Sequence, residues 1–396
     1  MTAKLRIGII FGGQSAEHEV SLVSATSVIN ALNKSKYEIV PIGIGKNGEW
    51  ITGPDAMEKL KNNSGENVVP VFLPPVPSVK HLVPTDKESS ISGFPQFFEK
   101  LDVVFPVLHG TFGEDGLIQG VFEMADIPYV GAGVLGSALS MDKILQKQVC
   151  TKFGLPGVDF LWLRGTDWEE NHNHGETPLL LNQLANMSQN QMINVMVERL
   201  GLPVFVKPPN LGSSVGISKA HTKKELAHAI KLALNYDKKV LIEKAVENAR
   251  EIEVSVLGND RLKASVAGEI IPSNEFYDYD AKYVDGASDL KIPADLPKDI
   301  HEAIQLMAIK AALATEVEGM ARVDFLLDAE TNRFFLNEIN TIPGFTQISM
   351  YPKLWEASGI RYSQLLDELI RLAMERYERR KRLNLSFQPK QEWFHE

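Results

Sequence analysis

The chain has 396 residues, a formal net charge of -10 at pH 7, 44% hydrophobic residues and 23% charged residues. This length predicts two or three domains, and the composition is that of an ordinary globular protein. The negative charge argues against nucleic acid as a partner, and no segment approaches the ~18 consecutive apolar residues of a membrane-spanning helix. Cys150 is the only cysteine. It excludes an intrachain disulfide and a thiolate metal cage, which fits a reducing compartment and predicts a cytoplasmic protein.

The first part of the chain alternates strand-like and helix-like segments. The apolar run in "RIGIIFGG" leads into polar residues without a signal-peptide cleavage site, so it predicts a strand. A helical pattern follows over 19–33, and strands are predicted at 37–44 and 101–110. This alternation indicates a parallel doubly wound sheet up to about residue 140. Residues 52–98, rich in Pro, Ser and Lys, are interpreted as an extended connection with little core of its own.

The second part of the chain opens with a polar insertion. Residues 164–194 are rich in Asn and Gln, which predicts an inserted loop with a short helix and a solvated setting for His172 and His174. A compact α+β unit is expected after it. Its predicted elements are strands at 203–207, 239–244 and 252–258, helices over 222–234 and 298–313, and a hairpin with strands at 321–327 and 333–339. The charged tail from Glu375 predicts a helix that then frays.

The last hairpin holds the most informative polar residues. Side chains alternate along a strand, so Arg322 and Asp324 share one face, as do Glu338 and Asn340. If the turn centres on Thr331, Asp324 lies opposite Glu338 and Arg322 opposite Asn340. Two opposed carboxylates repel unless a cation neutralises them, and a set of oxygen ligands selects Mg²⁺ or Mn²⁺ over zinc. The alternative is a solvated hairpin face with one Arg–Asp ion pair.

A loop after the hairpin favours the metal-binding interpretation. In "NEINTIPGFTQIS", Gly344 follows Pro343 and predicts a tight turn whose backbone N–H groups could face a developing oxyanion. Arg322 would supply positive charge nearby. A plain surface hairpin has no need of such a loop.

The segment "VFVKPPNLGSSVGISKA" allows two interpretations. It contains G-x-S-x-G, the pattern of a serine hydrolase nucleophile elbow around Ser214. Such an elbow leads from a strand directly into a helix and needs an aspartate and then a histidine downstream. Here a strand-like segment follows, and no downstream histidine has a triad setting. The small residues beside Lys207 instead predict a phosphate-covering loop, although the chain has no Walker-type pattern.

Several motifs together resemble a known family. Lys207, the Gly-Ser loop, "VLIEKAV" and "RVDF…NEIN" resemble the ATP-grasp fold. Six motifs in order resemble the D-alanine:D-alanine ligase family over about residues 5–372: "GGQSAEHEVS", "HGTFGEDG", "SMDK", "KPPNLGSSVG", "EFYDYDAKY" and "NEINTIPGFTQIS". The resemblance implies an α/β and α+β protein with an ATP-grasp fold. Its domains would be an N-terminal Rossmann-like domain (1–140), a central ATP-grasp domain (141–245) and a C-terminal ATP-grasp domain with a lid loop and the hairpin (246–396).

The resemblance also implies an activity. The enzyme would join two D-alanines into D-alanyl-D-alanine through a D-alanyl phosphate, with ATP and two Mg²⁺ or Mn²⁺ ions, for peptidoglycan precursors. It would act on small molecules as a homodimer. The alternatives are a ligase that adds D-lactate or D-serine, another ATP-grasp carboxylate–amine ligase, and an inactive nucleotide-binding scaffold. "HGTFGEDG" and "YDYDAKY" argue against another ATP-grasp ligase, and the intact hairpin argues against an inactive scaffold.

The resemblance implies a role for each of a set of residues. Lys143 and Lys207 would bind the ATP phosphates together with the loop at Ser214. The residues implied for the rest of the nucleotide are Glu243 for the adenine amino group, the backbone of Lys244 and Val246 along the base, and Glu251 for the ribose. The residues implied for the two metal ions are Asp324, Glu338 and Asn340.

The remaining implied residues surround the amino-acid substrates. Glu17 would bind the ammonium group of the first D-alanine. Ser213 would hydrogen-bond to Glu17 and Tyr283, tying the lid loop "NEFYDYDAKYVDGAS" over the site to exclude water. The residues implied near the acyl phosphate and the second substrate are His109, Lys282, Ser349, Gly344 and Arg322. Tyr283 is of the type that indicates a dipeptide product.

Overall fold

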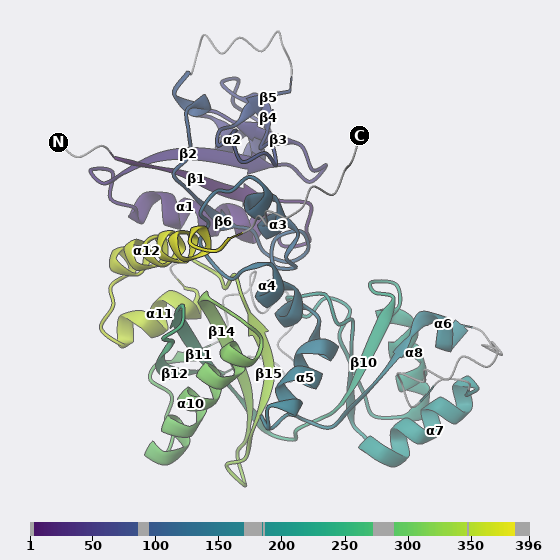
Figure 1. Cartoon of the computed structure of the whole chain (residues 1–396). Helices are drawn as coiled ribbons and strands as arrows, with labels where there is room; N and C mark the ends of the chain where they lie inside the picture. The colour runs from purple at the N-terminus through teal and green to yellow at the C-terminus, as the bar shows by residue number, and fades with distance from the viewer. Residues whose placement is uncertain are drawn as a thin grey trace, which may run out of the picture.

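The computed structural model describes residues 4–85, 95–169, 184, 187–271, 289–346 and 348–384. Within these ranges the strands form three sheets, one of six strands, one of four and one of five (Figure 1). The predicted lid loop with Lys282 and Tyr283 lies outside the described residues, as do His172 and His174. Among the described helices, none combines the length and apolar character needed to cross a bilayer.

The first sheet has the order β5-β4-β3-β2-β1-β6. Its parallel part consists of β1 (Leu5–Gly12), β2 (Tyr37–Ile44) and β6 (Val103–Val107), as predicted. The antiparallel part consists of β3 (Trp50–Thr52), β4 (Val69–Phe72) and β5 (Val83–Pro84). The helices with this sheet are α1 (His18–Ala31), α2 (Ala56–Asn62) and α3 (Leu117–Met124), with a 3-10 turn at Pro95–Phe98.

Two details of the prediction for this region are wrong. The sheet is mixed rather than wholly parallel, because the chain after β2 returns through short antiparallel strands. Residues 52–98 also contribute to the core, since Val71, Leu73 and Leu82 are buried there. Strands of two to four residues are too short to show an alternating pattern in the sequence.

The second sheet has the order β7-β10-β8-β9 and is antiparallel throughout. Its strands are β7 (Phe160–Arg164), β8 (Val204–Lys207), β9 (Ser218–Ala220) and β10 (Lys239–Lys244). The helices around it are α6 (Gly165–Glu169), α7 (Gln189–Leu200) and α8 (Lys223–Ala233). Two further helices, α4 (Val134–Met141) and α5 (Lys143–Lys152), connect the first sheet to the second. Asp142 caps α5, because its carboxylate accepts the backbone N–H groups of Ile144 and Leu145 at 3.1 Å.

The third sheet has the order β13-β12-β11-β14-β15. Its strands are β11 (Ala249–Gly258), β12 (Lys263–Ile271), β13 (Asp289–Lys291), β14 (Gly319–Asp328) and β15 (Phe334–Asn340). Helix α10 (Lys298–Ala314) packs Ile304 and Ala308 against Val323 and Phe325 of β14. Because side chains alternate along a strand, Arg322 and Asp324 project from the face of the sheet opposite to α10.

The last two helices connect the third sheet back to the first. These are α11 (Met350–Ala357) and α12 (Tyr362–Lys381), and α12 lies between the two sheets in Figure 1. Leu365, Leu366 and Leu369 of α12 share one hydrophobic core with Ile7 and Ile9 of β1. The first sheet therefore completes its core with residues from the far end of the chain.

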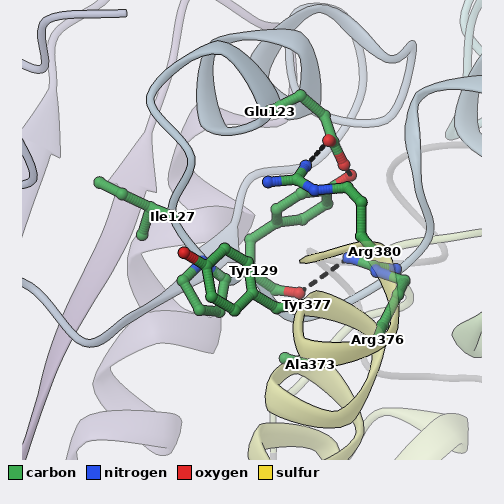
Figure 2. A pocket seen from close by; sticks show the side chains of 8 residues that line it. Glu123, Ile127, Tyr129, Ala373, Arg376, Tyr377 and Arg380 are labelled. Carbon is green, nitrogen blue, oxygen red and sulfur yellow. Dashed lines mark hydrogen bonds and ion pairs between the residues drawn. The ribbon is translucent and has the colours of Figure 1, made fainter. Parts of the chain in front are cut away.

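Polar contacts extend this packing along the second half of α12. Figure 2 shows Arg376 and Arg380 reaching from the helix toward Tyr129 and Glu123, with Tyr377 of the same helix beside them. The Arg376 guanidinium lies over the Tyr129 ring at 4.3 Å, and Arg380 forms an ion pair with Glu123. We call these five residues the α12 clasp. On the same helix Arg379 forms ion pairs with Asp260 and Glu318, next to the third sheet.

Candidate active site

Glu17 brings together three motifs that are far apart in the sequence. It immediately precedes α1 and its side chain is buried. The Ser213 hydroxyl donates a hydrogen bond to the Glu17 carboxylate. A Cβ atom added at Gly110 or Gly212 would meet Glu17 Oε2 at 2.8 Å and 3.1 Å. The "HGTFGEDG" and "LGSSVG" loops can therefore approach this carboxylate closely only because glycine stands at both positions.

The predicted register of the carboxylate hairpin is confirmed. Asp324 pairs with Glu338 and Arg322 with Asn340 across β14 and β15. A β-bulge lies between this part and the turn, where Phe325 pairs with Leu336 and Asn337 is the additional residue. The bulge places the polar ends of both strands opposite each other.

Arg322 neutralises the acidic side chains around it. Its guanidinium donates to both carboxylate oxygens of Asp324, at 2.7 Å and 2.6 Å, and lies 2.9 Å from Glu253 Oε2 on β11. Burial alone would lower the pKa of Arg322, but the charges of Asp324 and Glu253 raise it well above its usual value. Removing one partner from such a buried group of charges typically costs about 3–5 kcal/mol.

Lys143 connects three elements at this site. It opens α5, and its ammonium group lies 3.2 Å from Glu338 Oε2 on β15. The same group donates to the carbonyl oxygen of Leu211, at 2.9 Å, in the Gly-Ser loop. A lysine predicted to bind phosphate therefore lies between the loop and the carboxylate hairpin.

Glu243 is the centre of a buried ion cluster. Lys207 Nζ lies 2.6 Å from one of its oxygens, and Lys147 Nζ lies 2.5 Å from the other. Burial would raise the pKa of Glu243, but the charges of Lys147 and Lys207 lower it to about 2. Burial would likewise lower the pKa of Lys207, yet the Glu243 charge raises it. The sequence analysis missed Lys147, although it follows Lys143 at the four-residue spacing of one helix face.

The other residues predicted for the nucleotide lie at the end of β10, in the segment that follows it, on β11 and in the Gly-Ser loop. Lys244 ends β10 with an exposed side chain, and its backbone N–H donates to the backbone carbonyl oxygen of Asp159 at 2.9 Å. Val246 is half-buried two residues later, and Glu251 is half-buried on β11.

Ser214 lies in the Gly-Ser loop with φ of +60°. A strand, β9, follows this loop, and α8 begins only at Lys223, so the strand-to-helix geometry of a hydrolase elbow is absent from the described loop.

His109 is buried behind Glu17. Its Nδ1 lies 3.0 Å from the carbonyl oxygen of Ile342 and 3.8 Å from Glu114, and its Nε2 lies 3.1 Å from the Ser24 hydroxyl. Burial would lower the pKa of His109, but the nearby carboxylate of Glu114 and the charge of Glu17 raise it. Burial raises the pKa of Glu114 to about 7. Glu114 is a second residue that the sequence analysis missed, although it belongs to the quoted motif "HGTFGEDG".

The loop after the hairpin is folded tightly around a serine. The Ser349 hydroxyl accepts the backbone N–H of Thr346 at 3.0 Å and lies 2.7 Å from its hydroxyl. A Cβ at Gly344 would meet Ser349 Oγ at 2.7 Å, so glycine lets these two parts of the loop lie together. The structure thus brings Ser349 and Gly344 together, as the sequence analysis expected of them.

The hairpin has the donors that a hard divalent cation prefers. Asp324 and Glu338 are paired across the two strands, and Asn340 is the next polar residue on the same face. The amide oxygen of Asn340 accepts the backbone N–H of Ile342 at 3.2 Å, which fixes the orientation of that side chain. Carboxylate and amide oxygens fit Mg²⁺ or Mn²⁺, and the nearby lysines fit a phosphate chain. The arrangement suits the transfer of a phosphoryl group.

Two family models match the chain. The model described as D-ala D-ala ligase N-terminus matches residues 6–132, and the model described as D-ala D-ala ligase C-terminus matches residues 149–371. A D-alanine–D-alanine ligase from Thermoanaerobacter sp. (strain X514) is 51% identical over 374 residues, which are 94% of this chain and 97% of that protein. A D-alanine–D-alanine ligase from Natranaerobius thermophilus is 45% identical over 387 residues, 97% and 99% of the two chains.

Solved structures of ligases also resemble this chain. The VanG D-Ala:D-Ser ligase from Enterococcus faecalis is 35% identical with a TM-score of 0.79, covering 94% of this chain and 100% of that one. The D-alanine-D-alanine ligase from Coxiella burnetii is 36% identical with a TM-score of 0.76, covering 96% of each chain.

Proposed function

This chain belongs to the D-alanine–D-alanine ligase family, and from that premise we propose that it joins two D-alanines into D-alanyl-D-alanine at the expense of ATP. The product would serve peptidoglycan precursor synthesis. The arrangement of charges supports this proposal, because cationic side chains, a carboxylate hairpin and the ammonium-binding candidate Glu17 meet in one site.

Activation of the first substrate needs charge neutralisation. When bound, ATP would supply a phosphoryl group to the D-alanine carboxylate, giving an acyl phosphate and ADP, and two Mg²⁺ ions would neutralise charge on the transferred group. Lys143 and Lys207 would bind the phosphates, with the loop at Ser214 as their cover. Asp324, Glu338 and Asn340 would hold the metal ions. Both lysines already lie beside acidic partners that they would exchange for phosphate oxygens.

Glu243, Glu251 and the backbone of Lys244 and Val246 would bind the nucleoside. Glu243 has the pKa that this role needs, since a carboxylate that is ionised at neutral pH accepts a hydrogen bond from the adenine amino group. Glu251 lies near the start of β11, the strand that follows β10 in the chain. The nucleoside would therefore lie between the second and third sheets.

Glu17 would hold the ammonium group of the first D-alanine. Its carboxylate is buried and oriented by Ser213, so a cationic substrate group would supply its counter-charge. His109 contacts the loop that leads to Ser349 through the carbonyl oxygen of Ile342, and we assign His109 and the Ser349 loop to the second substrate and its carboxylate. Lys282 and Tyr283 belong to the same proposal as residues of the lid.

The bond-forming step would depend on Arg322 and the Gly344 turn. As the second amine attacks the acyl carbon, negative charge would develop on oxygen, and a preorganised guanidinium and backbone N–H would stabilise it. The carbon–oxygen bond to phosphate would then break, releasing inorganic phosphate, and the nitrogen would lose a proton to solvent. The loss of one such donor typically costs about 2.7–4 kcal/mol of activation free energy. Asp324 and Glu253 hold the Arg322 guanidinium in place before the substrate arrives.

The observation on which the proposal chiefly depends is the opposed pair of Asp324 and Glu338 beside Arg322 and Lys143. The test is phosphate release from ATP and Mg²⁺ with D-alanine, L-alanine or no amino acid, with the products separated. D-alanine-dependent release with an equal amount of dipeptide supports the ligase. ADP formation with another carboxylate, and none with D-alanine, would leave the fold and overturn the substrate.

A second function has one observation in its favour. The solved relative from Enterococcus faecalis is named a D-Ala:D-Ser ligase. D-serine and D-lactate therefore belong in the assay as competitors of D-alanine for the second position. A mixed product at equal concentrations would assign the chain to that alternative.

The remaining expectations extend the same proposal. The domains would divide at residues 140/141 and 245/246, between the sheets. The protein would work in the cytoplasm as a homodimer. Sedimentation equilibrium at assay concentrations tests the dimer directly.

A further inference from the structure

Glu243 has two cationic partners in this structure. Lys207 Nζ and Lys147 Nζ contact different oxygens of its carboxylate, at 2.6 Å and 2.5 Å. The side chains of Glu243 and Lys147 are 3% and 4% exposed, and that of Lys207 is 12% exposed. All three charges are therefore separated from bulk water, where each would be costly without its partner.

The two lysines differ in what else they reach. Lys207 ends β8, and its ammonium group also lies 3.4 Å from the Asn337 amide oxygen on the bulge of the carboxylate hairpin. It thus lies between Glu243 and the proposed metal site. Lys147 projects from α5, whose first turn is held by the Asp142 cap and by the contact of Lys143 with Leu211. Lys147 is consequently fixed on a rigid helix that faces Glu243.

This difference matters once a nucleotide enters. The proposed function moves Lys207 from Glu243 to a phosphate oxygen. Glu243 would then be a buried carboxylate with Lys147 as its remaining cation. Without any cation, such a carboxyl group takes up a proton rather than stay charged in an apolar setting. An ionised carboxylate only accepts hydrogen bonds, whereas a protonated one also donates.

We propose that Lys147 is a positioning residue for nucleotide recognition: it remains paired with Glu243 when Lys207 turns to the phosphates, and so keeps Glu243 an acceptor that selects adenine over guanine nucleotides. The adenine amino group donates to an acceptor, and the guanine carbonyl at the same ring position does not. This inference rests on the proposed function, because it assumes that a purine nucleotide binds at Glu243.

The test compares Lys147→Met with wild type by calorimetric titration of ADP and of GDP, with Mg²⁺ and without amino acid. The ADP affinity should fall at least about tenfold in the variant. The GDP affinity should fall much less, so the preference for ADP shrinks. Lys152→Met is the matched control, since Lys152 is exposed on the same helix, and it should change neither affinity.

Two further variants separate charge from packing. Lys147→Arg keeps the charge and should retain the preference for ADP. In a Glu243→Gln background, Lys147→Met should alter the ADP to GDP ratio less than about twofold, because the partner charge is gone. If Lys147→Met does not fold, Lys147→Gln, which keeps a donor without the charge, should give the same loss of preference.

The outcomes distinguish the role inferred for Lys147 from the proposed function on which it rests. A wild-type chain that binds neither nucleotide would overturn the proposed function. Equal losses of ADP and GDP affinity in Lys147→Met, with the ratio unchanged, would reduce Lys147 to a structural residue and overturn the inference alone.

Discussion

Single residues of the site are held in unusual protonation states. Burial and the nearby charge of Glu17 raise the pKa of Glu114 to about 7, although the neighbouring His109 opposes this. In the unfolded chain the same group has its ordinary pKa of 4.5. Between these values the folded chain holds a proton that the unfolded chain has released. Glu114 therefore contributes stability at low pH that is lost as the pH rises through about 7.

Glu114→Gln should remove this dependence. The free energy of unfolding of wild type minus that of the variant should fall by up to about 3 kcal/mol between about pH 4.5 and pH 8, as a shift of this size implies. Urea titrations of both proteins at several pH values measure it. The subtraction cancels the titrating groups that Glu114 does not influence, so the difference reports Glu114 together with His109, whose pKa it raises. Parallel stability curves for the two proteins would show that Glu114 titrates normally.

The sequence predicts residues of this kind unevenly. Side-chain alternation was enough to place Arg322 and Asp324 on one face, because it depends only on the strand. The pairing of Lys147 with Glu243 was not foreseen, since Lys147 meets this carboxylate through the packing of α5 against another part of the chain. Contacts between distant segments leave no periodic signal.

Among the elements, the Gly-Ser loop depends most strongly on its backbone conformation. Ser213, Ser214 and Gly216 all have positive φ values. A Cβ at Gly216 would meet the Tyr236 ring at 2.8 Å and Pro208 at 3.1 Å. The loop also holds Ser213 against Glu17 and Leu211 against Lys143. A shift of this loop would thus disturb both proposed substrate sites.

Gly216→Ala should lower both stability and ADP affinity. Gly154→Ala is the matched control, because Gly154 has φ of +75°, close to +73° at Gly216, and nothing lies within 4 Å of its added Cβ. Both variants pay the conformational cost of alanine in the left-handed region, about 1 kcal/mol. In Gly216→Ala alone, the clash with Tyr236 should lower the stability further and weaken ADP binding at least about threefold. Equal effects at both positions would mean that the loop adapts.

The hairpin shows how a correct prediction can rest on an incomplete argument. A turn centred on Thr331 gave the right pairing of Asp324 with Glu338, yet the pairs nearer the turn, such as Leu327 with Phe334, are displaced by one residue. The bulge at Asn337 restores the predicted register. Two successive polar residues between the buried Leu336 and Ile339 were the signal of this bulge in the sequence.

In the whole molecule, α12 fixes the first sheet relative to the third. The α12 clasp holds the helix to residues after β6, while Arg379 holds it to residues beside β14. Glu17 lies beside the first sheet and Arg322 on the third, so the distance between them depends on this helix. The residues proposed for the nucleotide lie on the second and third sheets and on α5, away from the clasp.

The double variant Arg376→Met/Arg380→Met should therefore raise the KM for D-alanine severalfold and leave the ADP affinity within about twofold of wild type. Arg371→Met is the control, since Arg371 pairs with Glu368 and Glu375 of its own helix. Steady-state kinetics and calorimetry on the three proteins decide the point. A loss of ADP affinity as large as the change in KM would contradict the assignment of α12 to the amino-acid site.

The overall arrangement was only partly visible in the sequence. The charged tail from Glu375 was expected to be helical, and α12 extends to Lys381. Nothing in its composition indicated that the apolar face of the same helix returns to β6 and α1, because these contacts join segments more than 250 positions apart. Resemblance to a family supplied the order of the domains, while periodicity supplied their individual strands and helices.

The core shared by β1 and α12 also sets an order of events during synthesis. Ile7, Ile9 and Phe105 are translated early, but Leu365, Leu366 and Leu369, which belong to the same core, are translated more than 250 residues later. The nascent first sheet must keep one apolar face uncovered while the other two sheets emerge. Folding from the amino terminus during synthesis therefore cannot complete the core of the first sheet before α12 is made. Until then the exposed apolar face is a natural site for chaperones or for aggregation.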